Sequence, residues 1–162
     1  MPRYRDSYRR LLIDMHIPDW DERFLARYDP VDLVDRAADS GVTGLMLYFQ
    51  AHTGLCYWPT ESGQQHRAFS RTDPVAEALA AAARRNLPVC AYYSVNFNNW
   101  AWEQFPEWRL QPVAETMIGG GLLQAPRYGI CCMNNPDYRQ FVATQTAEIV
   151  SGYEIDTLFF DM

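Results

Sequence analysis

The sequence contains no apolar run of the roughly 20 residues that a membrane-spanning helix needs, so no membrane partner is expected. No apolar segment precedes Leu11, which argues against a secretory signal and makes the cytoplasm the expected compartment. Basic blocks are limited to Arg9-Arg10 and Arg84-Arg85, and the net charge is −6. A phosphate-backbone partner such as DNA or RNA is therefore not expected.

Cysteine and glycine patterns typical of metal and cofactor sites are also lacking. The four cysteines include no C-x-x-C pair, so all are predicted to be reduced thiols rather than a disulfide frame or a zinc site. The turn predicted after the first strand, residues 14–18, has no glycine-rich fingerprint, which argues against a dinucleotide-binding sheet. No cofactor is expected.

The composition is that of a globular chain with many aromatic side chains. Its 162 residues, 48% of them hydrophobic, are enough for one domain with a sizeable core, predicted to span residues 1–162. Aromatic residues reach 14% and include five tryptophans, which indicates surfaces suited to stacking as well as a core.

Apolar runs alternate with helix-start signals along the chain. Helices are predicted to begin at Asp29-Pro30, Asp73-Pro74 and Asn135-Pro136, each with a capping side chain before a proline. Buried strands are predicted over residues 11–16, 44–49, 89–95 and 157–160. No Asn-Gly hairpin signal separates these strands, so parallel pairing with helical crossovers is predicted. Residues 96–134 show no sustained period and are expected to form a long connection that is functional or mobile.

Two architectures fit this order: an open doubly wound sheet and the first half of a (β/α)8 barrel. Polar residues close every strand, namely Asp14/His16, Gln50/His52, Tyr92-Tyr93-Ser94 and Asp161. Strand ends that share one mouth favour the barrel. Because a complete barrel takes roughly 250 residues, we expect a half-barrel fragment with four of the eight βα units. Its unpaired sheet edges would invite pairing with a second copy.

Asp161 is the leading candidate for a catalytic group, as a nucleophile or general base at the end of an apolar strand. The structural alternative is a helix N-cap. His16 and His52 also lie at strand ends, where neutral imidazoles can bind the hydroxyls of a sugar. Two alternatives stay open: a metal-dependent hydrolase that uses Asp14, His16, His52 and Asp161, or purely structural histidines. His66 is expected to be structural.

Tryptophans gather in the predicted loops at the same end of the strands. Indole faces pack well against the C–H faces of sugar rings, so these residues favour a carbohydrate ligand. The alternative interpretation is that these tryptophans form a small satellite core under a long loop. The residues are Trp58, Trp100, Trp102 and Trp108, accompanied by Asn96, Asn98, Asn99 and Tyr92.

Several of these segments, taken in order, resemble the α-L-fucosidase-type glycoside hydrolases. Asp14-Met15-His16 resembles their first-strand histidine, and Ala51-His52-Thr53-Gly54 resembles their His-His-Asp-Gly segment. Tyr92-Tyr93-Ser94 resembles their Tyr-Tyr-Ser, and Phe159-Phe160-Asp161 resembles the Phe-Asp that carries the nucleophile. Ala51, Thr53 and Met162 depart from the family pattern, which leaves the sugar open.

The resemblance implies a barrel-type retaining glycosidase that acts on an oligosaccharide or glycoside. Asp161 would be its nucleophile, His16 and His52 would bind sugar hydroxyls, and Tyr92 would line the site. Asp14, Trp58 and Trp100 are further candidates for sugar binding, from their positions in the sequence rather than from the resemblance. No metal would take part. The acid/base lies later in the relatives, so we expect residues 1–162 to be catalytically incomplete. A non-catalytic carbohydrate-binding fragment is the remaining alternative.

Overall fold

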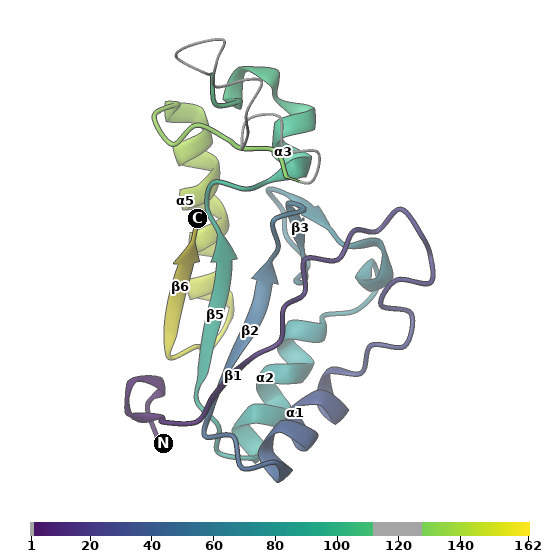
Figure 1. The fold of residues 1–162 in the computed structure, drawn as a ribbon, viewed down its shortest axis with the longest axis vertical. Coiled ribbons are helices and arrows are strands. Elements are labelled where there is room, and N and C mark those ends of the chain that lie inside the picture. The colour runs from purple at the N-terminus through teal and green to yellow at the C-terminus, as the bar shows by residue number, and fades with distance from the viewer. Residues whose placement is uncertain (1, 112–127) are drawn as a thin grey trace.

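The computed structural model describes residues 2–111 and 128–162, and it orders them as a sheet with helices (Figure 1). Its core is a run of four parallel strands that lie in space in their sequence order. They are β1 (Arg10–Leu12), β2 (Gly44–Gln50), β5 (Val89–Ser94) and β6 (Thr157–Asp161). The α/β class and the parallel pairing predicted from the sequence are confirmed for these strands.

The three main helices begin where the sequence predicts. They are α1 (Pro30–Asp39), α2 (Pro74–Arg84) and α5 (Pro136–Gly152), each with proline in its first turn. At α1 the Asp29 carboxylate accepts the backbone N–H of Val31 at 3.0 Å and of Asp32 at 2.9 Å. These bonds satisfy amide donors that have no partner within the helix.

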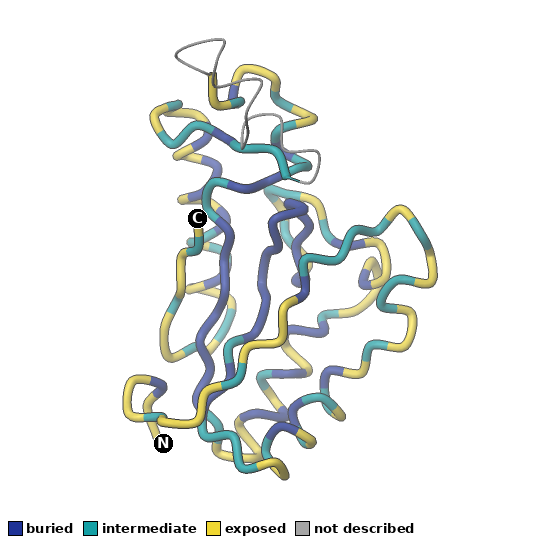
Figure 2. The backbone as a smooth tube through the Cα atoms, viewed as in Figure 1, coloured by how far each residue is buried: buried dark blue, intermediate teal, exposed yellow. Residues whose placement is uncertain are grey.

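The helices cover one face of the sheet. Leu45, Leu47 and Val89 point toward α1 and α2, which lie side by side in Figure 1. Tyr93, on the same face of β5, donates its hydroxyl to Gln145 of α5 at 2.7 Å. Figure 2 shows β2 and β5 buried in the middle of the sheet, whereas β1 and β6 carry exposed residues at its edges. No helix in the described ranges is long and apolar enough to cross a membrane.

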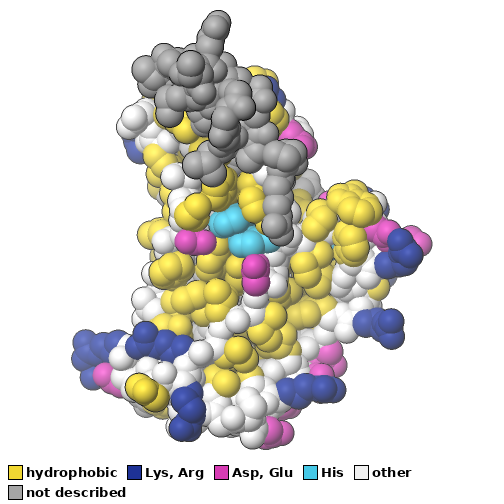
Figure 3. Space-filling model, viewed as in Figure 1, with side chains coloured by type: hydrophobic (Ala, Val, Ile, Leu, Met, Phe, Trp, Pro, Cys, Tyr) yellow, Lys and Arg dark blue, Asp and Glu magenta, His cyan; other side chains and the backbone are white. Residues whose placement is uncertain are grey.

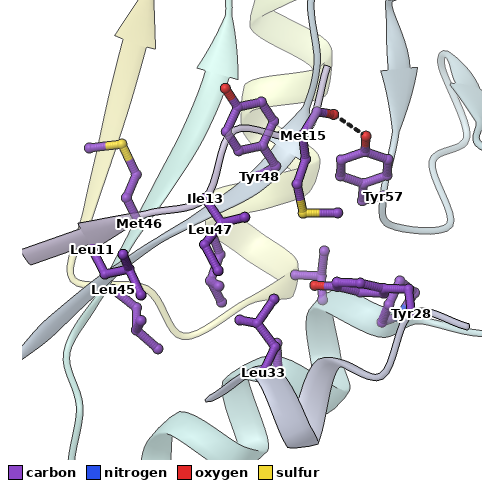
Figure 4. A pocket seen from close by; sticks show the side chains of 13 residues that line it. Leu11, Ile13, Met15, Tyr28, Leu33, Leu45, Met46, Leu47, Tyr48 and Tyr57 are labelled. Atoms are coloured by element: carbon purple, nitrogen blue, oxygen red, sulfur yellow. Dashed lines mark hydrogen bonds between the residues drawn. The ribbon is translucent and has the colours of Figure 1, made fainter. Parts of the chain in front are cut away.

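The first strand is shorter than predicted. Pairing with β2 ends at Leu12, and the following residues leave the sheet but remain fixed to it. The hydroxyl of Tyr57 donates to the backbone oxygen of Met15, as Figure 4 shows. Met15 thereby helps to close a small apolar cavity of about 20 Å³ between the sheet and α1 and α2. This anchoring gives His16 a defined position outside the strand.

The expectation that the strands pair only in parallel is wrong after β2. There the chain turns back, and β3 (Leu55–Cys56) pairs antiparallel with β2 and parallel with β4 (Gln64–Gln65). The turn is closed by the bond from Gly54 N to Ala51 O at 2.8 Å. Gly54 has a φ of +80°, a conformation that favours glycine, and it follows Thr53 rather than the asparagine typical of a hairpin turn.

Part of the stretch predicted to be irregular is also ordered. It contains α3 (Asn99–Gln104) and the 3₁₀ turn η3 (Pro106–Trp108). Asn98 caps α3 by accepting the backbone N–H of Ala101 at 2.8 Å, so the asparagine-rich segment includes a helix cap. The run Gly119-Gly120-Gly121 lies outside the described residues. Two further 3₁₀ turns are η1 (Tyr4–Asp6) and η2 (Arg67–Phe69).

Candidate active site

Side chains near the carboxyl ends of the parallel strands gather on the sheet face opposite the helices. Ser94 is the register partner of Asp161, and Tyr92 is the register partner of both Tyr48 and Phe159. Figure 3 shows histidine side chains on this open face with acidic side chains to either side and apolar side chains around them. The backbone thus gathers titratable groups from segments far apart in the sequence.

Asp161 lies at the last position of β6, with 31% of its side chain exposed. The hydroxyl of Tyr92 donates a hydrogen bond to its Oδ2, and Nε2 of His52 lies 3.9 Å from the same oxygen. Burial, followed by this hydrogen bond, raises the pKa of Tyr92 well above its usual value. Tyr92 is therefore a neutral phenol that donates to the carboxylate.

His52 is presented by the tight turn after β2. Its Nδ1 lies 2.7 Å from Oγ of the buried Ser94, which in turn donates to the backbone oxygen of Phe97 at 2.8 Å. A Cβ on Gly54 would lie 2.0 Å from Oδ1 of Asn98, so the turn packs directly against the segment that caps α3. The His52 ring is held both by its own loop and by β5.

His16 stacks on His52, with ring centroids 3.7 Å apart and 19° between the planes. Its Nδ1 accepts the backbone N–H of His52 at 3.0 Å, while its Nε2 lies 3.1 Å from the hydroxyl of Tyr48 and 3.4 Å from Oδ1 of Asp14. Asp14 is largely exposed and also accepts the Tyr48 hydroxyl at 3.1 Å.

Tyr48 is a site residue that the sequence reading missed. Its ring stacks on Tyr92 at a centroid distance of 4.1 Å. Burial and then the nearby charge of Asp14 raise the pKa of Tyr48 above its usual value. No sequence signal marks it, because the register of β2 shifts between Tyr48, the partner of Tyr92, and Gln50, the partner of Tyr93.

The tryptophans make other contacts. Trp58 is 2% exposed and donates its indole N–H to Oε2 of Glu148 in α5 at 3.0 Å. The indole of Trp100 packs against Phe105 and Phe141. The structure thus gathers Asp14, His16, His52, Tyr92 and Asp161, whereas the described contacts of Trp58 and Trp100 belong to the packing around α5. His66, also buried, holds the loop before α1 through the backbone oxygen of Pro18 at 3.2 Å.

The four side chains of the metal-dependent alternative lie near one another but are not arranged as a metal site. Within residues 2–111 and 128–162, no three histidine, cysteine or acidic side chains are grouped so that they could hold a metal ion. Nδ1 of His16 faces an amide N–H, which prevents that nitrogen from acting as a ligand. The four cysteines are all unpaired thiols.

Comparison with known families and structures agrees with the geometry. A family model described as hypothetical glycosyl hydrolase 6 matches residues 29–162. No curated protein matches the sequence. Among solved structures, α-L-fucosidase isoenzyme 2 from Paenibacillus thiaminolyticus aligns with a TM-score of 0.74 and 26% identity, over 99% of this chain and 24% of that one.

Two less similar structures share the fold. The Thermotoga maritima α-fucosidase in complex with fucose aligns with a TM-score of 0.59 and 20% identity, over 86% of this chain and 30% of its own. An α-L-fucosidase from Bacteroides thetaiotaomicron aligns with a TM-score of 0.59 and 16% identity, over 84% of this chain and 28% of its own. The chain thus spans about a quarter to a third of each of these fucosidases.

These findings confirm the resemblance to fucosidase-type glycoside hydrolases that the strand-end motifs indicated. The mixed sheet and its helices correspond to part of the fucosidase fold. On the match across residues 29–162, the chain belongs to the hypothetical glycosyl hydrolase 6 family.

Proposed function

We propose that this chain is the carbohydrate-binding part of a retaining glycoside hydrolase, with Asp161 as its nucleophile. One observation carries the proposal: Asp161 lies at the carboxyl end of β6, partly exposed, and accepts a hydrogen bond from Tyr92. An oriented, accessible carboxylate at a strand end has the properties that a glycosidase nucleophile needs.

In the proposed reaction, an Asp161 oxygen attacks the anomeric carbon of the sugar and forms a glycosyl ester. The bond from that carbon to the leaving group breaks, and the leaving oxygen takes a proton from a general acid. Water then hydrolyses the ester. The Tyr92 hydroxyl orients the carboxylate for the attack.

Hydrolysis of ordinary glycosides requires a second carboxyl group about 5 Å from the nucleophile. We propose that residues beyond 162 supply it, because the chain spans only 24% to 30% of the fucosidase chains quoted above. The carboxylate of Asp14 instead accepts the Tyr48 hydroxyl and lies beside His16. Residues 1–162 would then bind a sugar and accept it covalently but would hydrolyse unactivated glycosides poorly.

We propose that His16, His52, Tyr92 and Asp14 line the sugar site. Neutral imidazoles, a phenol and a carboxylate provide both donors and acceptors, which suits a polyhydroxylated ring. The contacts around Trp58 and Trp100 support a role in packing for these two residues. The substrate is a glycoside, and the names of the structural relatives favour an α-L-fucoside or a similar 6-deoxy sugar.

We also propose that the four parallel strands are an arc of a (β/α)8 barrel. Strands that follow one another in space in sequence order, with their helices on one face, support a barrel over a doubly wound sheet, whose strand order reverses. The outer edges of β1 and β6 pair with no described strand, so they would accept further strands or a second copy. Analytical ultracentrifugation tests for self-association.

The assignment of Asp161 as nucleophile can be tested without the general acid. A 2-deoxy-2-fluoro-α-L-fucosyl fluoride carries a leaving group that needs no protonation, and its 2-fluoro substituent slows hydrolysis of the ester. Attack by Asp161 breaks the C–F bond, releases fluoride and leaves the sugar on the carboxylate. Intact-mass measurement should show one added fluorosugar per chain, and peptide mapping should place it on Asp161.

The matched control is Asp161→Asn, which keeps the size of the side chain and removes the nucleophilic charge. We expect no label on this variant. A label on another carboxylate, or equal labelling of both proteins, would refute the nucleophile assignment. Titration with L-fucose, followed by histidine NMR shifts, separates the alternatives, because binding without labelling would identify a non-catalytic carbohydrate-binding module.

A further inference from the structure

The chain has only three histidines, and two of them are stacked at the candidate site. A neutral imidazole carries its proton on one of two nitrogens, and the partners of those nitrogens decide which. We infer that His16 and His52 are held in opposite tautomers, and that Ser94 is the positioning residue that places the His52 proton on Nδ1.

The assignment for His52 follows from the single proton of the Ser94 hydroxyl. That proton is donated to the backbone oxygen of Phe97 at 2.8 Å, an atom that can only accept. The 2.7 Å contact between Ser94 Oγ and His52 Nδ1 must therefore have the ring as its donor. Ser94 is fully buried, so no solvent competes for these bonds.

The assignment for His16 follows from a backbone amide. The N–H of His52 can only donate, and it points at Nδ1 of His16 at 3.0 Å. That nitrogen must carry the lone pair, so the proton lies on Nε2. From there it is donated to the Tyr48 hydroxyl at 3.1 Å, and Tyr48 donates onward to Asp14 at 3.1 Å.

The consequence concerns Nε2 of His52, which lies 3.9 Å from Oδ2 of Asp161. In the inferred tautomer this nitrogen carries no proton, so it does not donate to the carboxylate, whereas the Tyr92 hydroxyl does. A role of Ser94 in the reaction rests on the proposed function, but the tautomer assignment does not.

The experiment is a long-range ¹H–¹⁵N correlation spectrum of the full chain, labelled with ¹⁵N-histidine, near neutral pH. The pattern of ring nitrogens distinguishes the two tautomers directly. His66 serves as an internal reference, because its Nδ1 accepts the backbone N–H of Ala68 at 3.1 Å and its proton therefore lies on Nε2. We expect the Nε2–H pattern for His16 and His66 and the Nδ1–H pattern for His52.

Substitution of Ser94 tests its role as the positioning residue. In Ser94→Ala the Nδ1–H pattern of His52 should be lost or mixed, and the rate of labelling by the fluorosugar should fall about tenfold or more. Ser94→Thr keeps the hydroxyl and should restore the pattern. An Nε2–H pattern for His52 in the unmodified chain would overturn the inference even if no variant folds.

The two proposals fail separately. If Asp161 is never labelled but His52 shows the Nδ1–H pattern, the proposed function is wrong and the tautomer assignment stands. If labelling occurs and Ser94→Ala leaves both the tautomer and the labelling rate unchanged, Ser94 has no positioning role.

Discussion

The hydroxyl of Tyr92 on β5 donates a hydrogen bond to the carboxylate of Asp161 on β6, across a boundary between neighbouring strands. Tyr92→Phe removes this donor and leaves the ring. We expect fluorosugar labelling to slow about tenfold, which corresponds to about 1.4 kcal/mol of activation free energy. The labelling rate, followed by mass spectrometry, is the measurement.

Tyr93→Phe is the matched control for that prediction. The Tyr93 hydroxyl lies on the opposite face and donates to Gln145. Its removal should lower the free energy of unfolding by about 1 kcal/mol and leave the labelling rate of the folded protein unchanged. Equal slowing in both variants would show that the effect is general destabilisation.

Gly54→Ala is expected to disrupt the turn that presents His52. The φ of +80° is unfavourable for alanine, and its Cβ would lie 2.0 Å from Asn98 Oδ1 and 2.9 Å from Trp100 Cβ. We expect a loss of more than about 2 kcal/mol in unfolding free energy, measured by urea denaturation, together with loss of labelling. Gly152→Ala has no atom within 4 Å of its Cβ and should be close to neutral.

Glu148→Ala should separate packing from sugar binding. Glu148 accepts the indole N–H of Trp58 at 3.0 Å and the hydroxyl of Thr60 at 2.7 Å. An unsatisfied buried indole N–H costs about 1–3 kcal/mol, so stability should fall by that amount. The response to L-fucose should persist. Glu154→Ala, at an exposed position beyond α5, is the control.

His66 predicts a pH dependence of stability. Burial lowers the pKa of His66 below its usual value of 6.5, so the unfolded chain binds a proton there more readily than the folded chain does. The free energy of unfolding is therefore retained above about pH 6.5, the usual pKa of histidine, and falls as the pH drops below that value.

In His66→Asn, an amide oxygen can still accept the Ala68 N–H that His66 accepts, but the titration is removed. We expect this variant to be less stable near pH 8, yet to lose less additional stability between about pH 8 and pH 5. Urea midpoints across that range provide the test. If the urea midpoint of this variant falls with pH as steeply as that of the unmodified chain, the pH dependence of stability comes from other groups.

The elements that the sequence predicted correctly are those with local signals. Asp29-Pro30 and its two counterparts mark helix starts because capping depends on residues a few positions apart. The strand-end residues also came together as predicted, since parallel strands share one carboxyl edge. The antiparallel return after β2 was missed because its turn uses Gly54 at a φ of +80° and lacks the Asn-Gly pair that marks a hairpin in a sequence.

Only some members of the candidate site, and none of its hydrogen bonds, could be predicted from the sequence. His16, His52 and Asp161 each follow an apolar run, which is visible in the sequence. The roles of Ser94 and Tyr48 depend on contacts across 42 and 32 residues of chain. Such contacts have no local sequence signal, so the orientation of each ring requires the structure.

The pairing of β6 also links the candidate site to the order of folding. Asp156, just before β6, accepts the backbone N–H of Val89 across 67 residues of chain, and α5 lies between the two strands. Contacts over such separations form late because the intervening loop must first close. The proposed nucleophile Asp161 would therefore become reactive only after β6 has docked on β5. Covalent capture by the fluorosugar, sampled during refolding, would time that docking step without an added spectroscopic probe.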